Sequence, residues 1–139
     1  MRLHIPATQY TPEVKIDTES ALMFIRGACF PENSPAFFKP IRSFLQKASE
    51  LLQGGIKVHI ELSYINSSAQ REFYEMLREL VSWIPQTQVI IYLGEEEEEE
   101  DLRHVVAALR EEVGFERIEY RFEYYSDLMT AEESPPGER

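Results

Sequence analysis

The stretch IKVHIELSYINSSAQREF, residues 56–73, decides the fold because it joins an alternating strand to an amphipathic helix through a short polar turn. Apolar side chains occupy every second position from Val58 to Tyr64, and polar side chains from Lys57 to Ser63 fill the positions between them. Such alternation is typical of a strand with one buried face and one wetter face. We therefore expect the alternate apolar residues to point into the core, namely Val58, Ile60, Leu62 and Tyr64.

The polar turn leads into a helix whose apolar stripe ends before Pro85, a residue that cannot continue a helix. The stripe consists of Phe73, Leu77, Leu80 and Ile84. Asn66 or Ser67 is expected to cap this helix by accepting a hydrogen bond from one of its first N–H groups. A phosphate on a serine of the turn would be stabilised by the same N–H groups and would add close to two negative charges. The turn is therefore either a simple cap or also a modification site.

Upstream of this stretch, residues 11–16 and 21–26 have the pattern of two short strands, and we expect a hairpin between them. The loop GACFPENSP, residues 27–35, follows the hairpin and leads into another helix. Ser34 is expected to cap that helix, with Pro35 in its first turn. Its predicted apolar stripe is Phe37, Ile41, Phe44, Ala48 and Leu51.

Downstream, residues 88–93 predict a buried strand, residues 102–113 a third helix and residues 117–123 a last strand. The predicted order is a β-hairpin followed by α-β-α-β-α-β, which gives an α/β fold with a mixed sheet and right-handed parallel crossovers. Because the strands alternate, we expect the helices mainly on one face. Residues 1–126 are expected to form a single domain, and residues 127–139 a loose tail.

The composition favours a folded domain that works with protein partners. The chain has 139 residues, of which 43% are hydrophobic, and a single cysteine. No apolar stretch approaches the length of a membrane helix and no signal peptide is recognisable, so we expect a cytoplasmic protein without membrane insertion. Residues 1–94 hold nine acids and nine bases, whereas residues 95–139 hold sixteen acids and five bases, which accounts for the net charge of −11. Such an acidic segment should repel nucleic acids.

The sequence offers little for catalysis. It has no nucleophile elbow, phosphate-binding glycine loop or zinc-protease motif, and its three histidines lie far apart. Cys29 is expected to be a core residue. The run from Glu95 to Asp101 lacks the spaced ligands of a calcium loop and is expected to be a solvated segment before the third helix. We therefore expect no enzyme, no cofactor, no catalytic residue and no metal site.

Two alternatives to a phosphorylation switch stay open. One is a small ligand-binding module that uses the Pro31-Glu32-Asn33 loop, with Glu32 as acid or base and Cys29 nearby. The other is an adaptor that docks on a basic partner through Glu95 to Glu100, independently of phosphate.

Several motifs together resemble a known family. They are T-P-E-V (residues 11–14), G-x-x-F-P-E-N (27–33), F-F-x-P (37–40), Y-x-N-S-S (64–68) and an acidic loop before the third helix. In this order they resemble the SiaC family of bacterial regulatory phosphoproteins, over residues 8–122. That family is similar in style to the STAS domains of anti-sigma-factor antagonists, so the resemblance implies a STAS-like domain.

The resemblance also implies partner switching in signal transduction. A kinase would phosphorylate the turn hydroxyl and a metal-dependent serine/threonine phosphatase would remove the phosphate, at Ser67 or, as runner-up, at Ser68. The unmodified form would bind and activate a diguanylate cyclase and so control cyclic-di-GMP and biofilm formation. The implied turn and partner surface comprises Tyr64, Asn66, Ser68, Pro31, Glu32 and Asn33.

Three residues depart from the family pattern. Ser67 stands where threonine is usual, and serine accepts phosphate equally well. Ala28 and Cys29 stand where the family tends to have arginine and serine, a departure that bears on the choice of partner.

Overall fold

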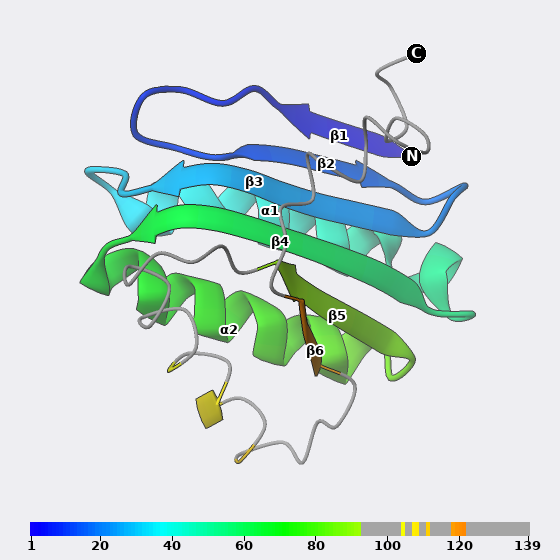
Figure 1. Cartoon of the computed structure of the whole chain (residues 1–139). Helices are drawn as coiled ribbons and strands as arrows, with labels where there is room; N and C mark the ends of the chain where they lie inside the picture. The colour runs from blue at the N-terminus through cyan, green and yellow to red at the C-terminus, as the bar shows by residue number, and fades with distance from the viewer. Residues whose placement is uncertain (93–103, 105–106, 109–110, 112–117, 122–139) are drawn as a thin grey trace, which may run out of the picture.

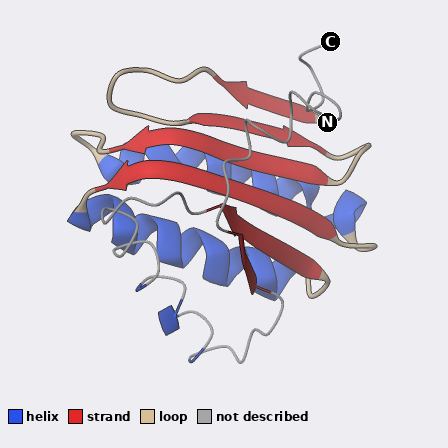
Figure 2. Ribbon diagram, in the orientation of Figure 1, coloured by secondary structure: helices blue, strands red, loops and turns tan. Residues whose placement is uncertain are grey.

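The computed structural model describes residues 1–92, 104, 107–108, 111 and 118–121. The elements in chain order are β1 (Arg2–Ile5), β2 (Glu13–Asp17), β3 (Leu22–Cys29), α1 (Ser34–Ala48), the 3₁₀ helix η1 (Ser49–Leu52), β4 (Ile56–Ile65), α2 (Ser67–Trp83), β5 (Thr87–Tyr92) and β6 (Ile118–Arg121). The strands form one twisted sheet, and α1 and α2 pack on the same face of it (Figure 1, Figure 2).

The order of strands in the sheet follows the order in the chain, β1-β2-β3-β4-β5-β6. The pairs β1–β2 and β2–β3 are antiparallel, and the pairs β3–β4, β4–β5 and β5–β6 are parallel. The expected α/β fold with a mixed sheet and an antiparallel hairpin is confirmed. Since right-handed crossovers in one direction along a sheet leave their helices on one face, α1 and α2 lie side by side.

Strand β1 is an addition that the sequence pattern did not predict. It has only four residues, so the alternation of exposed Arg2 and His4 with Leu3 and Ile5 covers just two apolar positions, too few to mark a strand by pattern alone. The pairing of Arg2 with Asp17 through Ile5 with Val14 places it at the edge of the sheet. A short edge strand that carries charge is a common way to limit pairing with other chains.

The core lies between the sheet and the two helices. The stripe predicted for α2 is confirmed, since all four of its residues are fully buried. The stripe predicted for α1 is partly wrong. The helix buries Phe38, Ile41, Leu45 and Ala48, while Leu51 is 61% exposed. The reason is that the α-helix ends at Ala48, and the tighter 3₁₀ turn that follows rotates Leu51 away from the sheet.

A bulge near the end of β4 reverses the predicted orientation of Tyr64. Gly27 of β3 pairs with Leu62, but the next residue, Ala28, pairs with Tyr64, so Ser63 is an extra residue in β4. An extra residue exchanges the faces of all side chains beyond it. Tyr64 is therefore 45% exposed instead of buried, and its neighbour Ile65 enters the core.

The backbone of Gly27 supports this bulge. Its φ is +125°, in a region that side-chain-bearing residues rarely adopt, and a Cβ atom there would lie 3.4 Å from the Cα of Pro12. The glycine of the G-x-x-F-P-E-N motif thus has a structural reason to be glycine.

Some predictions fall mostly or wholly outside the described residues. Of the third helix only residues 104, 107, 108 and 111 are described, and each is helical. The run from Glu95 to Asp101 and residues 127–139 lie outside. Within the described ranges, no helix is long and apolar enough to cross a membrane.

Candidate functional site

The turn before α2 is built around the side chain of Asn66. Its Oδ1 accepts a hydrogen bond from the N–H of Ala69 at 2.9 Å, and its backbone is extended, as a cap requires. Its own N–H donates to the carbonyl oxygen of Cys29 at 3.1 Å, which ties the turn to the end of β3. Of the two caps predicted for this helix, Asn66 is the correct one.

The loop before α1 ends in the same way. Oδ1 of Asn33 accepts from the N–H of Ala36 at 3.1 Å, so Asn33 is the cap, and the prediction of Ser34 is wrong. The helix begins one residue earlier than predicted because asparagine is itself a favoured cap residue and Asn33 occupies that position. Ser34 becomes the first helical residue, only 1% exposed, and Pro35 follows it where a missing N–H costs nothing.

The two helix starts are in direct contact. Oγ of Ser34 and Oγ of Ser68 are 2.8 Å apart, and Oγ of Ser68 also lies 3.4 Å from Oδ1 of Asn66. The contact follows from the topology, because β3 and β4 are parallel neighbours whose carboxyl ends lie at the same edge of the sheet. The P-E-N loop and the N-S-S turn, which the sequence presents as separate motifs, therefore form one site.

Ser67 differs from Ser34 and Ser68, the two serines that form this contact. Its side chain is exposed at the first position of α2, and its hydroxyl has no hydrogen-bond partner within the described ranges. The hydroxyl of Ser68, although that residue is also exposed, is engaged by Ser34. Among the three serines, Ser67 is the one that is exposed and whose hydroxyl has no partner among the residues that the structure describes.

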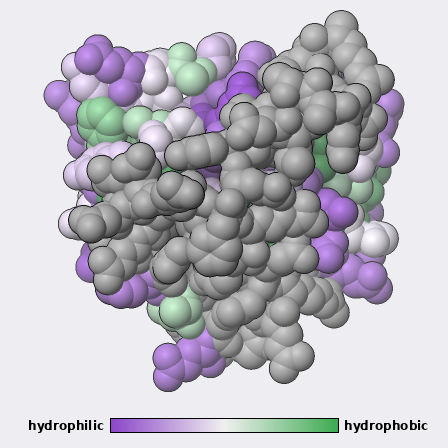
Figure 3. Space-filling view, in the orientation of Figure 1, coloured by the Kyte–Doolittle hydropathy of each residue, from purple (hydrophilic) through white to green (hydrophobic). Residues whose placement is uncertain are grey.

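Three aromatic rings lie beside the turn. Phe30 contacts Tyr10 and Tyr64 edge-to-face, with ring centroids 5.2 Å and 5.5 Å apart. Tyr10 is 52% exposed, so the cluster presents aromatic surface to solvent. Figure 3 shows that most of the visible described surface is hydrophilic, with small hydrophobic patches at both sides of the view, one of them at the end that holds the carboxyl end of β3. Exposed aromatic rings of this kind are typical of contact sites for other proteins.

The remaining residues of the P-E-N loop do not assemble acid–base chemistry. Pro31 is buried, whereas Glu32 and Asn33 are exposed. Cys29 is 1% exposed, and burial raises the pKa of its thiol to about 12, which keeps it protonated and unreactive. The expectation that Cys29 is a core residue is confirmed.

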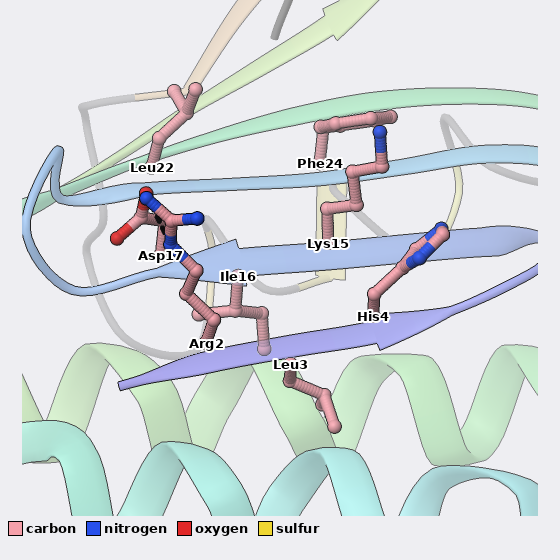
Figure 4. A pocket seen from close by; sticks show the side chains of 8 residues that line it. All are labelled: Arg2, Leu3, His4, Lys15, Ile16, Asp17, Leu22 and Phe24. Atoms are coloured by element: carbon pink, nitrogen blue, oxygen red, sulfur yellow. Dashed lines mark ion pairs between the residues drawn. The ribbon is translucent and has the colours of Figure 1, made fainter. Parts of the chain in front are cut away.

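A cavity of about 220 Å³ lies away from the turn, at the other end of β3 (Figure 4). Its charged groups already have partners. Arg2 reaches Asp17 at 3.4 Å, His4 meets Glu13 at 2.9 Å, and the ammonium group of Lys15 lies 5.4 Å from the centre of the Phe24 ring. We therefore assign the charges of this cavity to the structure of the sheet edge.

An ion-pair cluster joins the outer faces of the two helices. Nε of Arg42 on α1 donates to Glu79 at 2.6 Å, and its NH1 donates to Glu72 at 3.3 Å, both on α2. The hydrogen bond to Glu79 is the main cause that raises the pKa of Arg42 above its ordinary value. The cluster therefore adds two charge-assisted hydrogen bonds to the contact between the two helices.

No group of three histidine, cysteine or acidic residues within the described part of the chain is arranged to hold a metal ion. Sequence reasoning missed two contributors to the site, Ser34 as the partner of Ser68 and Tyr10 as an aromatic neighbour. The repeated pattern N-S-x-A at residues 33–36 and 66–69 was the available signal that the two helix starts are alike.

Comparison with known proteins agrees with this architecture. The chain superimposes on SiaC of Pseudomonas aeruginosa with a TM-score of 0.66 and 20% identity, over 89% of this chain and 97% of that chain. It matches a chain in the crystal structure of the P. aeruginosa diguanylate cyclase SiaD in complex with its activator SiaC with a TM-score of 0.70 and 22% identity, over 87% and 99% of the two chains. At this identity, the likeness shows the fold.

A curated relative, an uncharacterized protein of P. aeruginosa strain UCBPP-PA14, is 28% identical over 75 residues. The match covers 54% of this chain and 60% of the relative, less than two thirds of the relative's length.

The sequence profile of the SiaC family regulatory phosphoproteins matches residues 5–126, which include every strand of the described sheet except the first residues of β1, both helices and the whole of the candidate site. The chain belongs to the SiaC family of regulatory phosphoproteins.

Proposed function

We propose that the chain is a phosphorylation-controlled partner-switching protein and that Ser67 is the residue that carries the phosphate. The observation that carries this proposal is the exposed, uncommitted hydroxyl of Ser67 at the first position of α2. Membership of a family of regulatory phosphoproteins supports it.

The chemistry requires a kinase and a phosphatase as partners. The kinase transfers the γ-phosphoryl group of a nucleoside triphosphate to Oγ of Ser67. An O–P bond forms, the bond between the β- and γ-phosphates breaks, and the hydroxyl proton passes to a base of the kinase. A metal-dependent serine/threonine phosphatase hydrolyses the ester and regenerates Ser67. In this scheme the chain acts by binding, without catalysis of its own, and it acts in the cytoplasm.

The downstream partner that we propose is a diguanylate cyclase, which the unmodified chain binds and activates, with cyclic-di-GMP and biofilm formation as the output. A structural relative, SiaC, is the activator of the diguanylate cyclase SiaD in their complex. The docking surface would include the turn and the P-E-N loop, namely Tyr64, Asn66, Ser68, Pro31, Glu32 and Asn33. The exposed Tyr64 and Tyr10 rings supply the aromatic area that such a surface needs.

A phosphate on Ser67 would act mainly by exclusion. The N–H groups and dipole at the start of α2 stabilise an exposed anion by about 0.3–1 kcal/mol, so the modified domain stays folded. A docking surface that fits the neutral turn would instead have to bury an unpaired dianion, which costs several kcal/mol. A cost of about 3 kcal/mol weakens a complex more than a hundredfold.

Phosphopeptide mass spectrometry of the chain purified from its native cell tests the site. We expect phosphate on Ser67, and we expect a Ser67→Ala strain to show constitutive cyclase activation. Ser43→Ala is the matched control, because Ser43 is an exposed serine on α1 away from the turn. Phosphate found only outside the turn, together with a normal Ser67→Ala strain, would refute the assignment.

A second variant separates the switch from an acidic adaptor. Neutralising Glu95 to Glu100 should leave phosphate-sensitive binding of the partner intact. If it abolishes binding while Ser67→Asp has no effect, the chain is an adaptor that does not depend on phosphate.

A further inference from the structure

The two serines of the turn present their hydroxyls in different ways. Oγ of Ser68 lies 2.8 Å from Oγ of Ser34 and 3.4 Å from Oδ1 of Asn66. The hydroxyl of Ser67, one residue earlier, has no such partner within the described ranges. Both residues are exposed, so accessibility alone does not distinguish them as phosphate acceptors.

The hydrogens available to this cluster fix the direction of its bonds. Oδ1 of Asn66 is an acceptor and already receives the N–H of Ala69, so the 3.4 Å contact uses the single hydrogen of the Ser68 hydroxyl. The Ser68 oxygen therefore accepts from Ser34. Ser34 is 1% exposed, and in the opposite orientation the hydrogen of its hydroxyl would have no acceptor among the described residues, which makes this orientation the more stable one.

We propose that Ser34 is a positioning residue that holds the hydroxyl of Ser68, directs phosphoryl transfer to Ser67 and couples the P-E-N loop to the turn. This proposal rests on the proposed function, because it concerns the same phosphorylated turn.

The preference for Ser67 over Ser68 follows from what phosphoryl transfer requires of the accepting hydroxyl. The hydroxyl must aim an oxygen lone pair at the γ-phosphorus of the nucleoside triphosphate and release its proton to the base of the kinase. At Ser68 one lone pair is occupied by the hydrogen of Ser34, and the proton is directed at Asn66. At Ser67 no described residue occupies either the lone pairs or the proton of the hydroxyl. Since breaking one hydrogen bond of ordinary strength lowers a rate about fivefold, we expect Ser68 to be the slower acceptor by about that factor.

The coupling follows from the position of Ser34. It is the first residue of α1 and directly follows the Asn33 cap, so a change at Ser68 is transmitted to the P-E-N loop. Ser67 has no comparable side-chain contact among the described residues. Modification at the two positions should therefore leave different structural signatures.

The first experiment measures the ratio of phosphoserine-68 to phosphoserine-67 by site-resolved mass spectrometry of the chain purified from its native cell. Ser34→Ala frees the Ser68 hydroxyl and should raise the ratio about fivefold, whereas the exposed control Ser43→Ala should leave it unchanged. Ser34→Ala keeps the Asn33 cap, and a urea titration establishes that it folds. A ratio that does not change in the folded Ser34→Ala protein would overturn the selection role.

The second experiment needs no kinase and uses phosphoserine encoded genetically at position 67 or 68. In amide shift maps, phosphoserine at 68 should move the resonances of residues 32–36 as well as those of the turn, while phosphoserine at 67 should move residues 64–72 only. In a Ser34→Ala background, the response of residues 32–36 to phosphoserine-68 should disappear. Equal responses of residues 32–36 to both modifications would overturn the coupling.

The outcomes distinguish this proposal from the proposed function. If the turn carries no phosphate in the cell, the proposed function fails and so does the selection role, whereas the shift maps still decide the coupling. If Ser67 is phosphorylated but Ser34→Ala changes neither the ratio of the two phosphoserines nor the shift maps, the proposed function stands and the role proposed for Ser34 is wrong.

Discussion

The two helix starts carry nearly the same four residues, Asn-Ser-Pro-Ala at 33–36 and Asn-Ser-Ser-Ala at 66–69, and they differ in what the first serine does. Both asparagines cap their helices through the alanine N–H, at 3.1 Å and 2.9 Å. Yet Ser34 is 1% exposed and hydrogen-bonded, whereas Ser67 is exposed with no partner in the described part of the chain. The same local chemistry therefore gives a structural serine in one place and an accessible serine in the other.

The difference arises from tertiary packing. The start of α1 faces the turn before α2, so Ser34 points into the junction between them, while the next turn position, Ser68, supplies its partner. Within the described part of the chain, no residue provides an equivalent hydrogen-bond partner for Ser67. A hydroxyl that is buried and bonded serves stability, and a hydroxyl that is left free is available for regulation.

The largest expected effect comes from adding a charge to each serine. Ser34→Asp places a carboxylate where 1% of the residue is exposed and should lower the free energy of unfolding by about 3 kcal/mol. Ser67→Asp should change it by less than about 1 kcal/mol, because an exposed anion at a helix start is tolerated or stabilising. Urea unfolding of the two variants measures both. Similar losses for the two variants would mean that the helix starts are not distinct.

A smaller effect is expected at Gly27, whose bulge turns Tyr64 toward the site. Gly27→Ala should lower the free energy of unfolding by about 1–2 kcal/mol, because the backbone there has a positive φ that alanine rarely adopts. Gly54→Ala is the control, since a Cβ atom at Gly54 meets nothing within 4 Å. Thermal unfolding compares them. If Gly27→Ala behaves like the control, the bulge does not depend on glycine.

Removing either helix cap should lower the free energy of unfolding by the same amount. Asn33→Ala and Asn66→Ala each remove one side-chain hydrogen bond to a helix N–H, and each should destabilise by about 1 kcal/mol. Asn33→Asp and Asn66→Asp, which keep the acceptor, should restore most of the loss. Chemical denaturation of all four variants measures this, and a several-fold difference between the two alanine variants would show that the caps are not equivalent.

The smallest effect near neutral pH concerns Cys29, whose backbone carbonyl oxygen accepts the hydrogen bond from the N–H of Asn66. Its pKa is raised from the ordinary value of 9.0 to about 12 by burial. The unfolded chain therefore loses the thiol proton first, so this contribution to stability is complete below pH 9 and is lost as the pH rises from 9 toward 12. At pH 8 a thiol reagent should label the folded chain far more slowly than the unfolded chain. Rapid labelling of the folded chain would show that the junction opens.

Particular residues show which features local sequence patterns can predict and which they cannot. The Asn66 cap and the buried stripe from Phe73 to Ile84 follow from local patterns, and both were predictable. The exposure of Tyr64 was not, because one extra residue in β4, opposite the positive φ of Gly27, exchanges the two faces of the strand. The contact of Ser34 with Ser68 joins residues that are 34 positions apart and depends on the parallel pairing of two strands, which local patterns do not encode.

The central claim is that Ser67 carries the switch, and the rate of cyclic-di-GMP synthesis by a diguanylate cyclase from the same cell tests it most directly. The cyclase is assayed with unmodified chain, with Ser67→Ala and with chain that carries genetically encoded phosphoserine at position 67. We expect the first two to stimulate synthesis equally and the phosphoserine form to need more than a hundredfold higher concentration for the same stimulation. Equal stimulation by all three forms at equal concentration would contradict the account.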